Sequence, residues 1–286
     1  MRRLRSAIAV SLVVGLLVLL GSAPASAATP SSRSFLVTVP ESPGSGSSIR
    51  LDATLYTPAA TPAPAVLLAH GFGQTKADLD PEARRLQGEG YVVLAYTARG
   101  FGASGGRIGL DSLDGEVPDA RAMVDVLAAD RAVERRGSDP VVGVVGGSYG
   151  GALALMLGAT DPRIDTVVAA ITWNDLASAL APPSAGTVSG GASSPLRDFK
   201  VGWSARLFGA GITGSANACG RFTTAFCDLY RRLVTGGSPT AADLALLQRS
   251  SPSTVLSGMR APTLLLQGVQ DRLFGLDRLF LGTSKG

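Results

Sequence analysis

Short, wholly apolar segments alternate with helical segments along most of this chain. A helix with Asp80 as its cap and Pro81 in its first turn is expected after the first of these segments, and helices at 118–129 and 152–158 after later ones. The segments with the length and apolar content of buried strands are 65–69, 91–96, 141–145, 165–171 and 263–266. Strands that are apolar throughout and alternate with helices predict an α/β fold, with a mostly parallel sheet covered by helices on both faces.

The regions outside this alternation predict two additions to the core. Residues 35–39 and 49–56 flank a turn-rich stretch and predict a hairpin at the edge of the sheet. Between 173 and 252 the alternation stops, and Pro-rich and Gly-rich loops surround short helical stretches. This insertion predicts a helical cap over the carboxyl edge of the sheet, where open α/β folds bind ligands. The core is then formed by residues 34–172 and 253–286.

The first 27 residues are expected to lie outside the fold. Three arginines precede an apolar run at 7–20 that ends in A-S-A at 25–27, the pattern of a secretory signal peptide with an A-x-A cleavage site. A membrane span is the alternative, but the run is shorter than the roughly 20 residues that a span needs. We expect cleavage after Ala27, export to an extracellular location, and no stable membrane anchor.

The composition excludes several kinds of site. One His and two Cys cannot build a multi-histidine metal site or a four-thiolate cluster, so we expect no metal and no cofactor. The formal net charge of +4 includes three arginines of the leader, so the folded part has little excess of basic residues and we expect no nucleic-acid partner.

The two cysteines lie in the expected cap. In an oxidising compartment Cys219 and Cys227 predict a disulfide that closes a short loop, with two buried free thiols as the alternative. The spacing of four between Phe222, Phe226 and Tyr230 indicates an apolar helical stripe, which we interpret as packing rather than a ligand site.

A G-x-S-x-G motif occurs twice, at 102–106 and at 146–150. A nucleophile elbow needs a strand before it and a helix after it, and its tight turn requires glycine two positions away on each side. Ser148 meets these conditions, whereas Ser104 is followed by G-G-R, which does not begin a helix. We therefore predict Ser148 as the nucleophile and interpret Ser104 as an ordinary loop residue.

Two further parts of a hydrolytic site can be assigned around Ser148. The segment H-G-F-G that begins at His70 follows the first buried strand, so the backbone N–H groups of Phe72 and Tyr149 are the expected oxyanion hole. His70 is interpreted as a brace for this loop, with a role as the base as the less favoured alternative. Asp271 follows the last strand and is the expected orienting acid; an ordinary turn carboxylate there, and Asp175 as the acid instead, are the alternatives.

Three segments carry a resemblance to a known family: G-G-S-Y-G-G at 146–151, Y-T-A-R-G-F-G-A-S-G-G at 96–106 and W-N-D-L at 173–176. The chain resembles the α/β-hydrolase superfamily from about residue 51 to 274. Within it, the chain is similar to the X-Pro dipeptidyl-peptidase-like and cocaine-esterase-like serine hydrolases. The resemblance implies an enzyme that cleaves a peptide or ester bond of a small substrate through an acyl-enzyme, without a cofactor. Selectivity is expected to lie in the cap around 199–203, where the side chains serve either packing or substrate contact.

Two departures from that family affect the expected activity. Such relatives often carry a Tyr hydroxyl in the oxyanion loop, where this chain has Phe72, which weakens the expectation of X-Pro specificity. The family's catalytic His lies tens of residues beyond the acid, but no His follows Asp271. We expect that the C-terminal strand and helix and the base are missing through truncation, so that turnover is impaired. A non-catalytic secreted binding module is the alternative.

Overall fold

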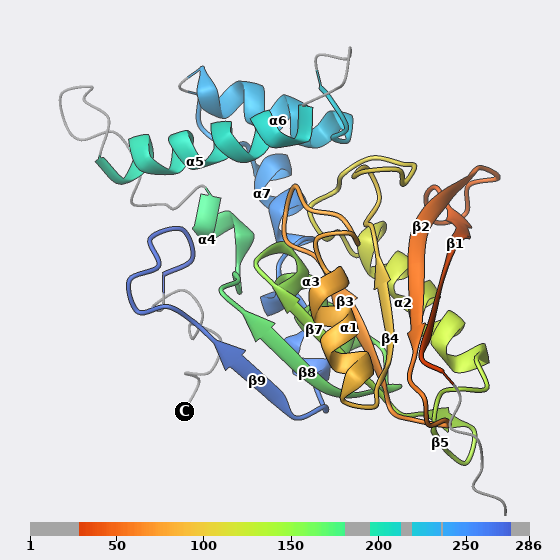
Figure 1. The fold of residues 1–286 in the computed structure, drawn as a ribbon. Coiled ribbons are helices and arrows are strands. Elements are labelled where there is room, and N and C mark those ends of the chain that lie inside the picture. Colours follow the sequence, from red (N-terminus) through yellow and green to blue (C-terminus); the bar gives the residue numbers. More distant parts are fainter. Residues whose placement is uncertain (1–28, 181–194, 213–218, 236, 276–286) are drawn as a thin grey trace, which may run out of the picture.

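The computed structural model describes residues 29–180, 195–212, 219–235 and 237–275. The expected signal peptide and the segment after residue 275 lie outside the described residues. A seven-stranded sheet with the strand order β1-β2-β4-β3-β7-β8-β9 forms the centre of the molecule (Figure 1). Its strands are β1 (Ser31–Pro40), β2 (Ser48–Thr57), β3 (Ala65–Ala69), β4 (Val92–Tyr96), β7 (Val142–Gly147), β8 (Ile164–Ala170) and β9 (Thr263–Leu266).

The directions of the strands confirm the predicted sheet. Neighbouring strands from β4 to β9 pair in parallel, whereas β2 runs antiparallel to both β4 and β1. The predicted hairpin therefore forms the β1 edge of the sheet. A separate short ribbon consists of β5 (Arg135–Arg136) and β6 (Asp139–Pro140).

Helices cover both faces of the sheet, as the apolar strands require. The helix α1 (Asp80–Gly88) packs on one face against the cluster that contains Val66, Leu68 and Val93. The helices α2 (Glu116–Ala129) and α3 (Tyr149–Thr160) pack on the other face with Leu67 and Leu94, which alternate with the first set along the strands. Residues 149–158 of α3 are all buried, since this helix lies between the sheet, α2 and the turns that follow the cap.

Two local predictions differ from the structure. The cap position of α1 is Leu79 rather than Asp80, whose carboxylate instead accepts hydrogen bonds from the Tyr56 hydroxyl (2.8 Å) and from Arg84 Nε (2.8 Å). The segment 263–266 is a strand, but it lies at the sheet edge, where Leu264 and Leu266 are 54% and 50% exposed. The prediction of a buried strand is therefore wrong for the described residues, because periodicity cannot tell a central strand from an edge strand.

The described parts of 173–252 contain four helices, which gather over the carboxyl end of the sheet at the top of Figure 1. They are α4 (Leu176–Leu180), α5 (Pro195–Ile212), α6 (Thr224–Val234) and α7 (Ala241–Gln248), followed by the 3₁₀ turns η2 (Pro252–Thr254) and η3 (Leu256–Gly258). Trp173 Nε1 donates to Ser250 O (2.8 Å), which ties the start of this segment to its end. Within the described ranges, no helix is both long and apolar enough to cross a bilayer.

Candidate active site

Ser148 occupies the turn between β7 and α3. Its backbone lies in the left-handed region, with φ 53° and ψ −117°, a conformation that non-glycine residues rarely adopt. The Ser148 N–H donates to Ala170 O on β8 (2.8 Å), and the Ser148 carbonyl accepts from Gly151 and Ala152 in the first turn of α3 (3.0 and 3.1 Å). These bonds hold the turn rigidly and leave the side chain partly exposed at the carboxyl end of the sheet.

The glycines on either side of Ser148 are required by close backbone contacts. A Cβ atom on Gly146 would lie 2.1 Å from Gly150 O, and one on Gly150 would lie 2.1 Å from Ala69 O. Both neighbours are backbone atoms of packed elements, so they cannot move aside cheaply. Steric space in the turn therefore explains the G-x-S-x-G spacing.

The serine of the other G-x-S-x-G motif has a different environment. Ser104 is 7% exposed, and its Oγ donates to Thr97 O (2.6 Å) and accepts from Asp52 N (3.0 Å). The Ser104 hydroxyl therefore braces a loop against β2, which agrees with its interpretation as a loop residue.

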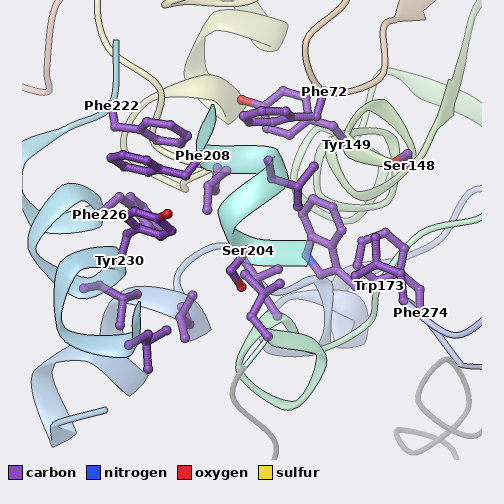
Figure 2. A pocket seen from close by; sticks show the side chains of 18 residues that line it. Phe72, Ser148, Tyr149, Trp173, Ser204, Phe208, Phe222, Phe226, Tyr230 and Phe274 are labelled. Carbon is purple, nitrogen blue, oxygen red and sulfur yellow. The ribbon is translucent and has the colours of Figure 1, made fainter. Parts of the chain in front are cut away.

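The two expected oxyanion donors lie beside Ser148. Phe72, Tyr149 and Ser148 line the same pocket, and Figure 2 shows all three together at one end of it. Neither the Phe72 N–H nor the Tyr149 N–H donates to an acceptor in the described part of the chain. The Tyr149 N–H lies in the first turn of α3, where backbone donors have no partner inside the helix and the helix dipole favours negative charge.

His70 has both ring nitrogens engaged in the loop that it belongs to. Ala98 N donates to Nε2 (2.9 Å), so Nδ1 carries the proton and donates to Gly71 O (2.8 Å). The ring is 2% exposed and makes aromatic contacts with Phe101 and Tyr149. Burial lowers the pKa of His70 below its ordinary value of 6.5, so the ring stays neutral near pH 7. His70 therefore braces the loop at 70–73, and neither ring nitrogen is available to take a proton from Ser148.

This environment predicts a specific pH dependence of stability. Below pH 6.5 the unfolded chain binds a proton at His70 that the folded chain does not, so the free energy of unfolding falls as the pH falls. Between pH 7.5 and 5.5 the wild-type protein should lose more stability than a His70→Asn variant, by at most about 1.4 kcal/mol, the limit for a ring that stays neutral in the folded state, measured by urea unfolding at each pH. Equal pH dependence in the two proteins would show that folding does not lower the pKa of His70.

The loop that carries Asp271 is connected to Ser148 by a chain of hydrogen bonds. Thr172 Oγ1 donates to the Ser148 carbonyl (2.7 Å), and Thr172 N donates to Gln267 Oε1 (3.1 Å). Gln267 Nε2 then donates to Asp271 Oδ2 (3.0 Å) and to Phe274 O (2.6 Å). The other Asp271 oxygen, Oδ1, accepts from the N–H groups of Leu273 (2.8 Å) and Phe274 (2.9 Å). Gln267, which sequence reasoning did not single out, therefore fixes the Asp271 loop next to the nucleophile turn.

The rival acid, Asp175, has a local structural role. Its Oδ1 accepts from Ser178 N (2.6 Å), and its carbonyl accepts from Ala179 N (3.1 Å). These contacts cap the N-terminus of α4, a common use of an aspartate before a helix. Asp271 makes local contacts of the same kind through Oδ1 and differs from Asp175 in its additional bond to Gln267.

A buried polar cluster lies behind Tyr149. The Tyr149 hydroxyl donates to Glu116 Oε1 (3.2 Å), and Arg99 forms a bidentate pair with Asp119 (2.6 and 2.7 Å). Burial raises the pKa of Asp119 to about 6, against the effect of Arg99. Burial, together with the neighbouring Glu116, also raises the pKa of Asp111 and so favours its protonated form, and burial likewise keeps the Tyr149 hydroxyl neutral.

The pocket at Ser148 extends between the core and the cap helices (Figure 2). Phe222, Phe226 and Tyr230 line it, and they also pack in or against the hydrophobic core, as the interpretation of the stripe as packing predicts. Phe222 precedes α6 rather than belonging to it. Spacing identified the apolar stripe, but only the fold shows that it lines the same pocket as Ser148. On α5, the pocket is lined by Ser204, Leu207 and Phe208, which follow the segment 199–203 in the sequence.

The structure joins Cys219 and Cys227 in a disulfide, with an S–S distance of 2.08 Å. The closed loop contains Phe222 and ties it to α6, so the bond supports one wall of the pocket. Among the described residues, no group of three or more His, Cys, Asp or Glu side chains is arranged to hold a metal ion.

Comparisons with known proteins agree with this geometry. The family model of the X-Pro dipeptidyl-peptidase (S15) family matches residues 45–279. A monoacylglycerol lipase of Mycolicibacterium smegmatis is 33% identical over 115 residues, which cover 40% of this chain and 39% of the lipase. The chain thus aligns with about two fifths of the length of that relative.

Solved structures share the fold at low sequence identity. A 2,6-dihydroxy-pseudo-oxynicotine hydrolase aligns with a TM-score of 0.57 and 20% identity, over 87% of this chain and 56% of that one. An esterase of Pyrococcus furiosus aligns with a TM-score of 0.52 and 18% identity, over 86% and 75% of the two chains. An acylaminoacyl peptidase of Pyrococcus horikoshii aligns with a TM-score of 0.52 and 14% identity, over 88% and 34%. At these identities the likeness concerns the fold alone.

Proposed function

Since the chain belongs to the X-Pro dipeptidyl-peptidase (S15) family and is a hydrolase of the α/β-hydrolase fold, we propose that it cleaves a peptide or ester bond of a small substrate through an acyl-enzyme on Ser148. The observation that carries the proposal is the left-handed backbone of Ser148 at the mouth of a pocket. Such strain persists where the surrounding structure enforces it, and it is typical of functional sites. The similarity to a monoacylglycerol lipase supports ester substrates, and the family name supports X-Pro peptides.

In the proposed reaction, Ser148 Oγ attacks the substrate carbonyl carbon. The carbonyl oxygen becomes negatively charged and accepts hydrogen bonds from the Phe72 and Tyr149 N–H groups. Collapse of this intermediate breaks the bond to the leaving group, which takes up a proton. Water then attacks the acyl-enzyme, releases the acid and restores the serine hydroxyl.

The proton of Ser148 Oγ needs an acceptor, and the sequence offers no second histidine. We assign to Asp271 the role of the acid that would orient a histidine base, on the strength of its anchored loop. In this chain the proton passes to solvent, so we propose that turnover is slow. We also propose that the protein is exported, with its leader removed after Ala27, because of the charge and apolar pattern of residues 1–27.

A non-catalytic binding module is less well supported. A binding function needs the pocket but not a strained serine with unengaged N–H donors beside it. The combination of Ser148, Phe72 and Tyr149 therefore favours catalysis.

Labelling with a small alkyl fluorophosphonate tests the proposal. We expect one covalent adduct, located at Ser148 by peptide mass spectrometry, which forms slowly and faster at alkaline pH because no base assists the serine. Ser148→Ala should abolish the adduct, whereas Ser104→Ala, a matched change in the other G-x-S-x-G motif, should retain it. Absence of an adduct at Ser148 even at alkaline pH, or an adduct on another residue, would overturn the assignment.

A further inference from the structure

The lining of the cavity beside Ser148 restricts the substrate groups that can bind next to this serine. None of the described side chains that line it is charged, and most are aliphatic or aromatic. The polar atoms of two lining residues are already used: the Trp173 indole N–H donates to Ser250 O, and the Tyr149 hydroxyl donates to Glu116. These two residues therefore contribute apolar ring faces to the cavity.

A series of aromatic rings connects the oxyanion loop with the far end of the cavity (Figure 2). Phe72 stacks on Phe222 with centroids 6.0 Å apart, Phe222 on Phe208 at 4.8 Å, and Phe208 on Tyr230 at 3.7 Å. Phe72 also packs edge-on against Tyr149, at 5.6 Å. A group attached to a carbonyl at Ser148 would therefore run along a continuous apolar wall.

The segment that holds this wall is fixed to the core. Ile108 N donates to Arg221 O (2.7 Å), and Thr223 N donates to Ile108 O (3.0 Å). Arg221 also donates to the carbonyl oxygens of Gly100 (3.2 Å) and Gly102 (2.8 Å). With the disulfide on α6, these contacts hold Phe222 on both sides, so the wall exists before a ligand binds and little ordering is needed on binding.

The free ammonium of an X-Pro dipeptide does not suit this cavity. A buried charge without a partner costs several kcal/mol, and a carboxylate is the usual partner for an ammonium group. The buried carboxylates behind Tyr149 are those of Asp111, Glu116 and Asp119, and none of the three lines the cavity. An uncharged apolar group gains free energy there instead, about 0.8 kcal/mol for each buried methylene.

We propose that this cavity is an acyl pocket that selects an uncharged, apolar acyl group of about four to five carbons. The inference rests on the proposed function, because an acyl pocket requires that Ser148 attack the carbonyl. The chain length follows from the cavity volume of about 80 Å³. That is roughly half the volume of an engineered apolar cavity of about 150 Å³ that binds benzene, so it holds three or four carbons beyond the carbonyl.

Binding of unreactive amides tests the pocket without relying on the nucleophile. Primary amides from acetamide to octanamide would be titrated into the full chain, with affinity followed by NMR. We expect the dissociation constant to fall about fourfold per methylene up to pentanamide and then to level off. The charged ligand Ala-Pro amide should bind more weakly than hexanamide. Affinity that is independent of chain length, or tighter binding of Ala-Pro amide, would overturn the proposal.

Two variants on α5 test whether the amides bind in this cavity. Ser204 lines the cavity, whereas its neighbour Ala205 does not. Ser204→Asp should weaken hexanamide binding by roughly tenfold or more and improve binding of Ala-Pro amide, since it supplies a carboxylate to the cavity. Ala205→Asp should leave both affinities within about twofold, as expected for a change that does not reach the bound ligand. Leu207→Phe, which adds no charge, should shorten the preferred amide by filling the cavity. Equal effects of the two aspartate variants would place the ligand elsewhere.

The two proposals can fail separately. Chain-length dependence without labelling of Ser148 would retain an apolar ligand site and overturn the catalytic assignment. Labelling of Ser148 without chain-length dependence would retain the nucleophile and overturn the acyl pocket.

Discussion

Hydrolysis of 4-nitrophenyl butanoate by this chain is expected to exceed the buffer rate by no more than about 10⁴-fold, with the whole excess dependent on Ser148. The loss of the histidine of a serine triad costs on the order of 10⁶ in turnover, and the oxyanion hole and substrate binding supply what is left. Here the only histidine of the sequence, His70, donates to Gly71 O and accepts from Ala98 N, so it cannot replace the base. Initial rates of the wild-type protein, Ser148→Ala and buffer alone measure the excess.

Added imidazole provides a second test of whether Ser148 lacks a base. Because Ser148 is partly exposed, a base from solution can reach its hydroxyl, and the Ser148-dependent rate should rise with imidazole concentration. The Ser148→Ala variant serves as the control, since imidazole also cleaves activated esters by itself. Fast hydrolysis without imidazole that survives His70→Ala but not Ser148→Ala would show that another residue acts as the base.

Gly146→Ala is expected to destabilise the protein by about 4 kcal/mol or more, a large part of the 5–15 kcal/mol that stabilises most domains. The added Cβ would lie 2.1 Å from Gly150 O and 2.3 Å from Gly150 C, so β7 and α3 would have to separate at the nucleophile turn. Labelling of Ser148 should be lost together with the fold.

Gly147→Ala is a matched control one residue along the same strand. Its Cβ would meet nothing closer than Ala170 O at 3.9 Å, an ordinary contact, so the free energy of unfolding should change by less than about 1 kcal/mol. Urea unfolding followed by tryptophan fluorescence compares the two variants. Similar stabilities would show that the backbone of the turn can relax around Gly146 and that steric space does not explain the motif.

The sequence predicts the parallel core well, because each central strand is identified by local features. The segments 65–69 and 141–145 are apolar throughout, and the first corresponds to β3 residue for residue. The G-x-S-x-G motif at 146–150 lies between a strand and a helix that are both recognisable from composition. Local prediction fails where position in the sheet matters: 263–266 resembles a buried strand, yet β9 lies at an edge and its side chains are exposed.

The turn at Ser148 follows from the sequence by itself. Strand, turn and helix are adjacent in the chain there, so their signals are local. The tertiary structure alone decided what faces that turn. Phe72, Phe208 and the segment that holds Phe222 and Tyr230 come from three separate parts of the chain, and only long-range packing stacks their rings beside Ser148. The role of Gln267 was decided in the same way, since its hydrogen bonds join the ends of two strands that are neighbours in the sheet and about a hundred residues apart in the chain.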